Sequence, residues 1–304
     1  MTAVSAGEAA TTPAPSRSAL RPLLRFVRTA DLSVRLSLGW MTICLSVVAL
    51  GGILSPYDPN AIDLLARLQP PAFLTGDTAH ILGTDDLGRD ILSRLLHAMR
   101  VSLLVVVIGM PIGATVGAIV GFLAAYFRGF VDELISMLID AQAALPYMIV
   151  ALSVIAFLGS NTVLLMIVIG SYGWERYARL SRSLCLSLLE RGYVVAAQTY
   201  GVSGFTLYRR HLLPNAMGVL LVNMTMTFAE IMLLESSLSF LGLGFQPPVA
   251  SLGNMIGLGR EYILTAWWVA VIPGLAICLT ALSASFIGDE LRDRFHSKVG
   301  AGPS

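Results

Sequence analysis

Long apolar runs that carry no charge limit what this chain can fold into more than any other feature. A helix needs about 20 apolar residues to cross the hydrocarbon core of a bilayer, and at that depth its backbone groups must bond within the protein. The sequence therefore predicts an all-α integral membrane protein. We expect six crossings, over residues 36–54, 101–127, 134–158, 162–180, 212–241 and 262–288.

The fourth crossing is the weakest of the six. Only 13 residues, counted from Thr162, precede Glu175 and Arg176, so we expect this helix to continue to Leu180 with its charges at the membrane interface. Composition agrees with a membrane protein, because 13% of the residues are charged, against about 25% in soluble domains. The net charge of +1 provides no basic field that would recruit nucleic acid.

The basic residues predict the orientation. When both termini lie in the cytoplasm, the cytoplasmic segments are 1–35, 128–133, 175–211 and 289–304. Only five of the 20 basic residues then fall on the outer side, namely Arg67, Arg89, Arg94, Arg100 and Arg260. The positive-inside rule favours this N-in, C-in topology.

The two ends of the chain differ in character. Residues 1–16 are rich in Ala, Thr, Ser and Pro and are predicted to be a disordered tail. Over 17–35, arginines recur on one helical face, which predicts an amphipathic helix on the inner membrane surface; ordinary flanking charge is the alternative. An extracytoplasmic loop (55–100), a core (101–288) and a cytoplasmic tail (289–304) follow the first crossing.

The outer loop contains a glycine-punctuated acidic turn ahead of an amphipathic helix that leads into the second crossing. Asp85, Asp86 and Asp90 lie near Gly83 and Gly88, but their spacing is not that of a calcium loop. We expect no metal site here. A capped turn that docks against the membrane or a partner is the interpretation that the pattern favours.

Inside the membrane, Gly109, Gly113, Gly117 and Gly121 recur every four residues and so predict a face that another helix approaches closely; a flexing gate helix is the alternative. Three intramembrane acids, Asp140, Glu230 and Glu235, are functional candidates by default. Glu230 and Glu235 face about 140° apart on a helix and cannot form one paired site. Scattered single acids favour structural pairing over a proton relay.

The segment 194–215 is soluble-looking and lies in the largest cytoplasmic loop. "SLLERGYVVAAQTYG" predicts a helix closed by Gly201. Ser203 can cap a second short helix, and Pro214 suits the first turn of the fifth crossing. Two short helices with a glycine bend would form a rigid knob, with Ala196 and Ala197 as a small docking surface. An amphipathic loop lying on the membrane is the alternative.

The sequence signals no catalytic chemistry. It contains neither HExxH nor GxSxG, and its three cysteines match no metal pattern. The only lysine, Lys298, is not part of a phosphate-binding GxxxxGK[ST] loop. We therefore predict a non-catalytic protein without a cofactor of its own. Uphill transport by such a chain needs a partner or an ion gradient.

The loop resembles the EAA loop of ABC importer permeases, whose consensus is E-A-A-x3-G-x9-I-x-L-P. Here it reads Val195-Ala196-Ala197, three residues, Gly201, nine residues, then "HLLP" ending at Pro214. The ending "RHLLPN" is similar to the dipeptide, oligopeptide and nickel branch. Three further stretches resemble the C-type permease of that branch: "LGTDDLGRDILSRLLHAMRVSLL", "ESSLSFLGLGFQPPVASLGNMI" and "TAWWVAVIPGLAICLTALSASFIGDELRD". The resemblance covers about residues 75 to 300.

The resemblance implies a type I importer permease in a bacterial inner membrane, with the loop 175–214 coupling it to an ATPase. The contact residues it implies are Val195, Ala196, Ala197, Tyr200, Gly201, Val202, Ser203, Leu213 and Pro214. It also implies a second, B-type permease, two ATPase subunits that hold ATP and Mg²⁺, and an extracytoplasmic substrate-binding protein. Val195 departs from the family glutamate, so a charge pair with the ATPase would be missing; the alternative is that the ATPase has changed in step.

Two function classes follow from these observations. The first is the permease subunit of an ATP-driven importer, most simply for dipeptides or oligopeptides, with nickel or a sugar as alternatives inside the family. The second is an ion-coupled secondary transporter, which needs ion ligands near the midplane and often internal repeats. No residue in the sequence identifies the substrate-binding positions.

Overall fold

The computed structural model describes residues 30–300, so the predicted tail 1–16 and the greater part of the predicted interfacial helix 17–35 lie outside the described residues. Across the described part, the chain is helical apart from turns, loops and one isolated bridge between Thr84 and Asp90. The helices of the first half are α2 (Leu32–Leu54), α3 (Ala72–Thr75), α4 (Ile91–Phe127), α5 (Gly129–Ala144), α6 (Tyr147–Leu158) and α7 (Thr162–Gly170). Those of the second half are α8 (Trp174–Leu189), α9 (Gly192–Thr199), α10 (Gly204–Leu207), α11 (Leu213–Phe240), α12 (Leu252–Gly259) and α13 (Trp268–Gly300).

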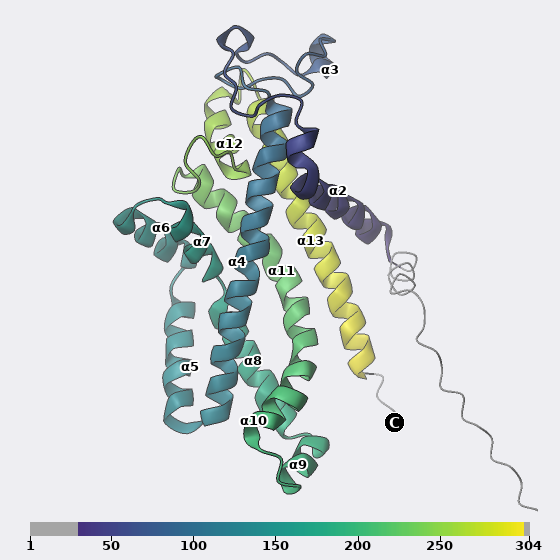
Figure 1. The fold of residues 1–304 in the computed structure, drawn as a ribbon, viewed down its shortest axis with the longest axis vertical. Coiled ribbons are helices and arrows are strands. Elements are labelled where there is room, and N and C mark those ends of the chain that lie inside the picture. Colours follow the sequence, from purple (N-terminus) through teal and green to yellow (C-terminus); the bar gives the residue numbers. More distant parts are fainter. Residues whose placement is uncertain (1–29, 301–304) are drawn as a thin grey trace, which may run out of the picture.

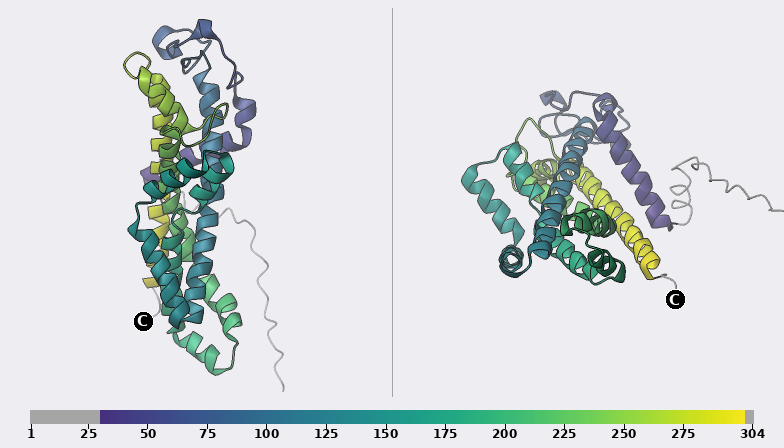
Figure 2. Two further views of the ribbon diagram at one scale, coloured as in Figure 1. Left: turned by 90° about the vertical axis from the view of Figure 1, so that its left-hand side faces the viewer. Right: turned by 60° about the horizontal axis from the view of Figure 1, so that its bottom comes forward.

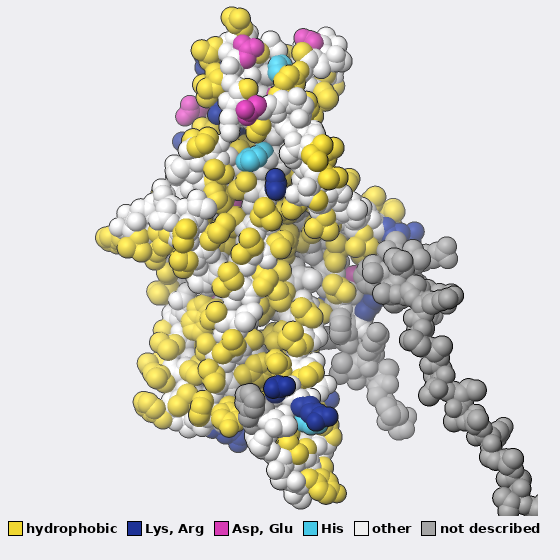
Figure 3. Space-filling model, viewed as in Figure 1, with side chains coloured by type: hydrophobic (Ala, Val, Ile, Leu, Met, Phe, Trp, Pro, Cys, Tyr) yellow, Lys and Arg dark blue, Asp and Glu magenta, His cyan; other side chains and the backbone are white. Residues whose placement is uncertain are grey.

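Four stretches of helix in the described chain are long and apolar enough to cross a membrane. They are α2, α4, a helix over Tyr208–Phe240 that includes α11, and α13 as far as Arg294; α5 and α6 make a fifth if they are counted as one span. Apolar side chains cover the middle of the molecule in Figure 3, and charged ones gather toward its two ends. The all-α membrane class is therefore confirmed, while the count of six crossings stays a prediction.

The predicted third crossing, 134–158, is not one straight helix. It consists of the upper part of α5 and the whole of α6, and the two helices meet at 87°. Proline lacks a backbone N–H and disfavours helical geometry in the residue before it. Leu145, just before Pro146, is accordingly extended, with φ −95° and ψ 131°. In Figure 1, α6 projects sideways at mid-height, away from the line of α5.

The predicted fourth crossing, 162–180, is also divided. α7 ends at Gly170, and α8 begins after Gly173, whose φ of +77° lies in the left-handed region. Only glycine adopts this conformation without strain, and it cannot continue a right-handed helix. Figures 1 and 2 place α5 to α7 on one side of α4, and α2 and α13 on the other.

The glycine stripe of α4 forms a close seam with α7 and α8, which confirms the packing prediction. A Cβ at Gly113 would lie 2.8 Å from the carbonyl oxygens of Gly170 and Tyr172, and one at Gly117 would lie 2.7 Å from Cβ of Tyr177. At Gly121 a Cβ would collide with the carbonyl of Ala178. Side chains are thus excluded from the seam, and the backbones of α4 and α8 touch.

The outer half of the bundle has its own packing device in α12, a short helix that the sequence analysis did not predict. Ser251 and Asn254 form a capping box at its start. Because Gly253 and Gly257 lack side chains, α12 approaches the backbone of α11 at Ser236 and Phe240. Part of the signal was present in the sequence, since Ser251 is a favoured cap residue and Asn254 lies where a capping box usually has glutamate or glutamine.

Candidate functional site

The cytoplasmic loop folds as two short helices around a glycine bend. α9 ends at Thr199, and Gly201 follows with φ +78°. The N–H of Val202 donates to the carbonyl of Ala197 at 3.2 Å, and the N–H of Tyr200 donates to Ala196 at 3.0 Å. These bonds satisfy carbonyls at the end of α9 in the manner of a left-handed C-terminal cap, which requires glycine at the turning point.

The second helix leads directly into the membrane. The carbonyl of Ser203 accepts from the N–H of Leu207 at 2.9 Å, and its hydroxyl bonds the hydroxyl of Thr206 at 2.8 Å. A π-helical turn, Tyr208–Leu212, joins α10 to α11, and Pro214 lies in the first turn of α11. α10 and α11 therefore form one nearly continuous path from the bend into the bundle.

The first helix of the loop is shorter than the sequence predicts. A single helix over 187–201 is wrong, because α8 ends at Leu189 and α9 begins at Gly192. A turn separates them, in which the N–H of Arg191 donates to Leu188 at 3.2 Å. Gly192 destabilises a helix interior by about 1 kcal/mol relative to alanine, which favours a break beside it. α8 and α9 can then take different directions.

A small apolar core holds the two helices against the bundle. Its fully buried members come from α4, α8 and the loop itself: Ala125, Cys185, Leu188, Val194, Leu207 and Leu212. Val202 and Ala197 are partly buried against the same core. We call α9, the bend and α10 the knob. Because the knob shares this core with the end of α8, a displacement of one is passed to the other.

Five of the predicted contact residues are exposed on the knob, namely Val195, Ala196, Tyr200, Gly201 and Ser203. Tyr200 is 88% exposed, Val195 is 48% exposed, and Ala196 is also exposed. Ala197, predicted beside Ala196 as a docking surface, instead turns toward the knob's own core. Leu213 is 38% exposed at the base. The knob lies at one end of the molecule (Figure 1), where Val195, Ala196 and Tyr200 give it an apolar and aromatic tip.

The acidic turn of the outer loop is built as predicted. Asp85 accepts from the N–H groups of Leu87 and Arg89 at 2.9 Å each, and from Nε of Arg89 at 2.7 Å. Asp90 caps α4, since its carboxylate accepts from the N–H of Ser93 at 2.8 Å. His80 Nδ1 lies 3.0 Å from the other oxygen of Asp90. These acids therefore serve the fold of the turn.

The intramembrane acids fall into separate environments, as the spacing predicts. Glu235 is completely buried and accepts from the hydroxyl of Ser239 at 2.8 Å. Glu230 pairs with Arg176 at 2.6 Å, and Asp140 pairs with Arg179 at 2.9 Å. Sequence reasoning missed these partners, because it placed the arginines only as cytoplasmic charge. The available signal was the three-residue spacing of Arg176 and Arg179, which places the two arginines near one face of α8.

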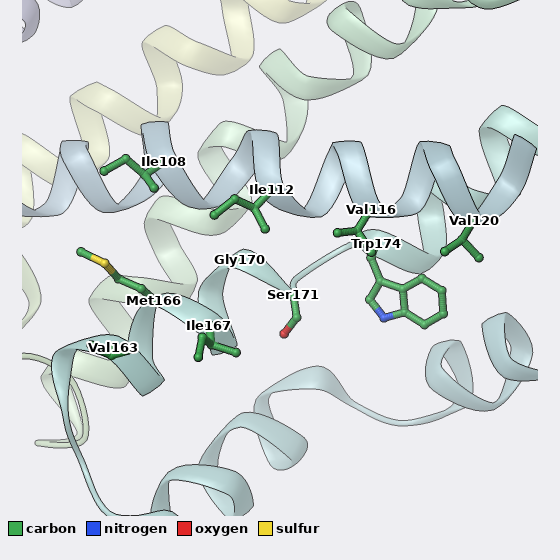
Figure 4. A pocket seen from close by; sticks show the side chains of 10 residues that line it. All are labelled: Ile108, Ile112, Val116, Val120, Val163, Met166, Ile167, Gly170, Ser171 and Trp174. Atoms are coloured by element: carbon green, nitrogen blue, oxygen red, sulfur yellow. The ribbon is translucent and has the colours of Figure 1, made fainter.

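An apolar groove of about 610 Å³ runs between α4 and α7. Figure 4 shows Ile108, Ile112 and Val116 of α4 on one side, Ile167 of α7 on the other, and Trp174 at one end. Its lining is almost entirely hydrocarbon, with the Ser171 hydroxyl and the Trp174 indole as its polar groups, so it offers no charged group that could pair with a charged ligand. The groove is therefore not the part of the chain that would recognise a polar substrate.

Comparison with known proteins identifies the group to which these features belong. Residues 113–300 match the family described as "Binding-protein-dependent transport system inner membrane component". The matched region includes the knob, the glycine seam from Gly113 onward, and both acids of α11.

Curated relatives align over nearly the whole chain. A di/tripeptide transport system permease protein of Pseudomonas aeruginosa is 37% identical over 276 residues, which cover 86% of this chain and 91% of the relative. The dipeptide transport system permease protein of Escherichia coli is 38% identical, covering 86% and 87%. A putative peptide transport system permease protein of Brucella suis is 39% identical, covering 83% and 84%.

Among solved structures, the fold is similar to a chain of the MetNI methionine ABC transporter in an inward-facing conformation. The TM-score is 0.53 at 19% identity, and the match covers 66% of this chain and 95% of the other. At this identity the likeness supports the fold alone.

Proposed function

The chain belongs to the family of binding-protein-dependent transport system inner membrane components, and from that premise we propose that it conducts dipeptides or short oligopeptides as the permease subunit of an ATP-driven importer. It is a multi-pass inner membrane protein, and it is a non-catalytic subunit whose family leaves ATP hydrolysis to separate subunits. The peptide assignment rests on the names of relatives aligned over more than 80% of this chain.

The observation that carries the coupling role is the knob. It exposes Val195, Ala196 and Tyr200 at one end of the bundle and is fixed behind them by a buried core. An apolar, aromatic tip on a rigid base suits docking into a complementary cleft. In this proposal the cleft belongs to an ATPase subunit, and Gly201, Val202, Ser203, Leu213 and Pro214 hold the shape of the tip.

The proposed topology is six crossings with both termini inside. α7 and α8 together form the crossing that helix length alone does not identify. The distribution of arginines supports this topology, as does the position of the knob and the α4–α5 corner at the same end of the molecule (Figure 1). The predicted helix over 17–35 would lie along the inner surface beside them.

The proposed assembly contains a second, B-type permease, two ATPase subunits with ATP and Mg²⁺, and an extracytoplasmic binding protein that delivers the peptide. This chain forms half of the pathway. Closure of the ATPase pair moves the knob, and the shared core carries that movement into α8 and α11. Val195 offers no carboxylate to the ATPase, so docking here depends on shape.

The experiment that tests the proposal is reconstitution in proteoliposomes with the partner permease, the ATPase subunits and the binding protein. We expect uptake of radiolabelled dialanine that requires ATP hydrolysis. A matched complex, in which the ATPase subunits bind ATP but do not hydrolyse it, should show none. Uptake driven by an ion gradient alone would refute the importer and favour a secondary transporter.

A further inference from the structure

A cluster of charged and aromatic side chains lies where α7, α8 and α11 meet. Arg176 Nη1 lies 2.6 Å from Glu230 Oε2. The hydroxyl of Tyr172 links the two residues, since it donates to Glu230 at 3.0 Å and accepts from Arg176 at 2.9 Å. The Arg176 guanidinium also lies over the Tyr172 ring, 5.4 Å from its centre. We call Tyr172, Arg176 and Glu230 the polar cluster.

The polar cluster is held firmly from behind. The ring of Tyr147 meets that of Tyr172 edge-on, with centres 5.0 Å apart. The Tyr147 hydroxyl contacts the hydroxyl of Ser171 at 2.9 Å and donates to the carbonyl of Val168. The bend at Pro146 begins the helix that brings Tyr147 to this position. The aromatic pair is thus a rigid support, not a pair of free surface residues.

The depth of the cluster excludes an ordinary surface role. Glu230 is ten residues from Phe240 at the end of α11, or about 15 Å at 1.5 Å per residue. The other end, at Leu213, is about 26 Å away by the same measure. Glu230 therefore lies within the hydrocarbon layer, which is about 30 Å thick. Charges at such depth face the bundle interior, a partner or a water-filled cavity.

Both charged side chains are nevertheless accessible on this chain. Arg176 is 45% exposed and Glu230 is 42% exposed. They open onto a polar face of α8, where Arg179, Ser183 and Ser187 are also exposed. This face leads from the cluster down to the end of α8 beside the knob. A polar strip at membrane depth that reaches the cytoplasmic loop is suited to line a pathway for a polar substrate.

The charge balance of the cluster favours a ligand with a cationic end. Glu175, next to Arg176, is largely buried, and its Oε2 is a buried atom without a hydrogen-bond partner in the described structure. Two carboxylates therefore face a single guanidinium. A free peptide carries both an ammonium and a carboxylate, so it can exchange with the existing pair: the ammonium binds Glu230 and the carboxylate binds Arg176. Glu230 and Arg176 thus each have an opposite charge as a partner in both states.

From this geometry we propose that the polar cluster is a transient binding site for the two charged ends of a peptide inside the pathway. The proposal rests on the proposed function. Because the site closes on itself when the ligand leaves, binding is weak and release is easy, as conduction requires. Arg176 and Glu230 are both joined to the knob, Arg176 through α8 and Glu230 through α10 and α11, so movement of the ATPase would reach the cluster through both helices.

The first test is protection of a cysteine beside the cluster. Leu233 is 50% exposed one turn from Glu230; Cys278 is exposed and is replaced by serine, while Cys44 and Cys185 are buried. In the assembled, detergent-solubilised complex, a charged methanethiosulfonate should label Leu233→Cys. Dialanine should slow the labelling about tenfold, equivalent to about 1.4 kcal/mol. N-acetyl-dialaninamide, which has no charged ends, should not slow it.

Leu279→Cys is the control for depth. It is 43% exposed on α13, 11 residues from the outer end of that helix, as Glu230 is ten residues from the outer end of α11. It should resist the charged reagent. In Leu233→Cys, adding Arg176→Gln or Glu230→Gln should abolish protection by dialanine, while Arg176→Lys should restore part of it. Size-exclusion chromatography checks that each complex is intact.

Two results would overturn the site. Equal protection by the capped peptide would show that charged ends are not recognised. An unlabelled Leu233→Cys in a complex that still takes up dialanine with ATP would show that the cluster is not on the pathway, and would leave the proposed function intact. Loss of ATP-dependent uptake in the unsubstituted complex would instead refute the proposed function and the site with it.

Discussion

The two faces of α8 differ in almost every physical respect. One face lies against the glycine stripe of α4 and is so close that a Cβ at Gly117 or Gly121 would collide with it. Tyr177 and Ser181 on that face are buried, and the Tyr177 hydroxyl donates to Thr227 of α11 at 2.9 Å. The opposite face carries Arg176 and Arg179, both exposed and both paired with acids from other helices.

The difference shows how α8 can be fixed to α4 on one face and still exchange its contacts on the other. The seam fixes α8 to α4 by backbone contact, so the two move together. The polar face contacts α5 and α11 through ion pairs, which can exchange partners without leaving a buried charge unpaired.

Breaking the seam should have the largest effect. Gly117→Val would place side-chain atoms against the carbonyl of Trp174 and Cβ of Tyr177. Overpacking costs about 1–3 kcal/mol, and more where backbone must shift. We expect loss of folded protein, measured as the monodisperse fraction after solubilisation. Gly39→Val in α2, where a Cβ meets nothing within 4 Å, is the matched control. Normal yield of Gly117→Val would show that the seam is looser than described.

Blocking the tip of the knob should separate transport from folding. Ala196→Trp adds bulk to the exposed surface while leaving the buried core of the knob unchanged. We expect normal membrane insertion, dialanine uptake below about a tenth of wild type (about 1.4 kcal/mol in equivalent free energy), and weaker co-purification with the ATPase subunits. Ala196→Ser is the conservative control. Wild-type uptake by the tryptophan variant would contradict the docking role of the tip.

Local signals in the sequence predicted the parts of the molecule that local contacts determine. The glycine stripe has a four-residue period, and the acidic turn bonds residues two to four apart, so both follow from spacing. The bends in the third and fourth runs were harder to predict. Hydropathy counts Leu145 and Pro146 as part of one apolar run. A helix break at Leu145 could still have been predicted, because the residue before a proline disfavours helical geometry.

The polar cluster could not be predicted from spacing. Arg176 and Glu230 lie on different helices, and their meeting depends on the break at Gly173 and the approach of α8 to α11. The resemblance to a permease family located the knob but named no substrate-binding residue. It also could not show that Ala197 faces inward while Ala196 faces outward, because that depends on how the knob is rotated against its core.

Straining the bend should have an intermediate effect. Gly201→Ala places a Cβ on a residue with φ +78°, which costs about 1–2 kcal/mol. Since a Cβ there meets nothing within 4 Å, any defect comes from backbone conformation and not from a clash. We expect reduced uptake per ATP hydrolysed and faster hydrogen exchange in α9.

Gly192→Ala is the matched control for the bend. Its Cβ also meets nothing within 4 Å, and its φ is not in the left-handed region. It should leave coupling unchanged and stabilise α9 slightly, since alanine favours helix. Equal coupling defects in the two variants would show that flexibility of the whole loop, rather than the bend, governs transmission to α8.

Weakening the lower end of the polar face should have the smallest effect. Arg182 Nε and Nη2 lie 2.5 and 2.6 Å from the two oxygens of Asp132 on α5. The pair is partly exposed, so Asp132→Asn should lower stability by about 1 kcal/mol or less, seen as a lower melting temperature of the complex, with uptake near wild type. Glu133→Gln makes the same charge change next to it on α5 and should alter neither. A different result would change this view: Asp132→Asn could reduce uptake as strongly as Arg176→Gln at an unchanged melting temperature. Peptide recognition would then extend along the whole polar face of α8, and the polar cluster would be only the upper end of that face.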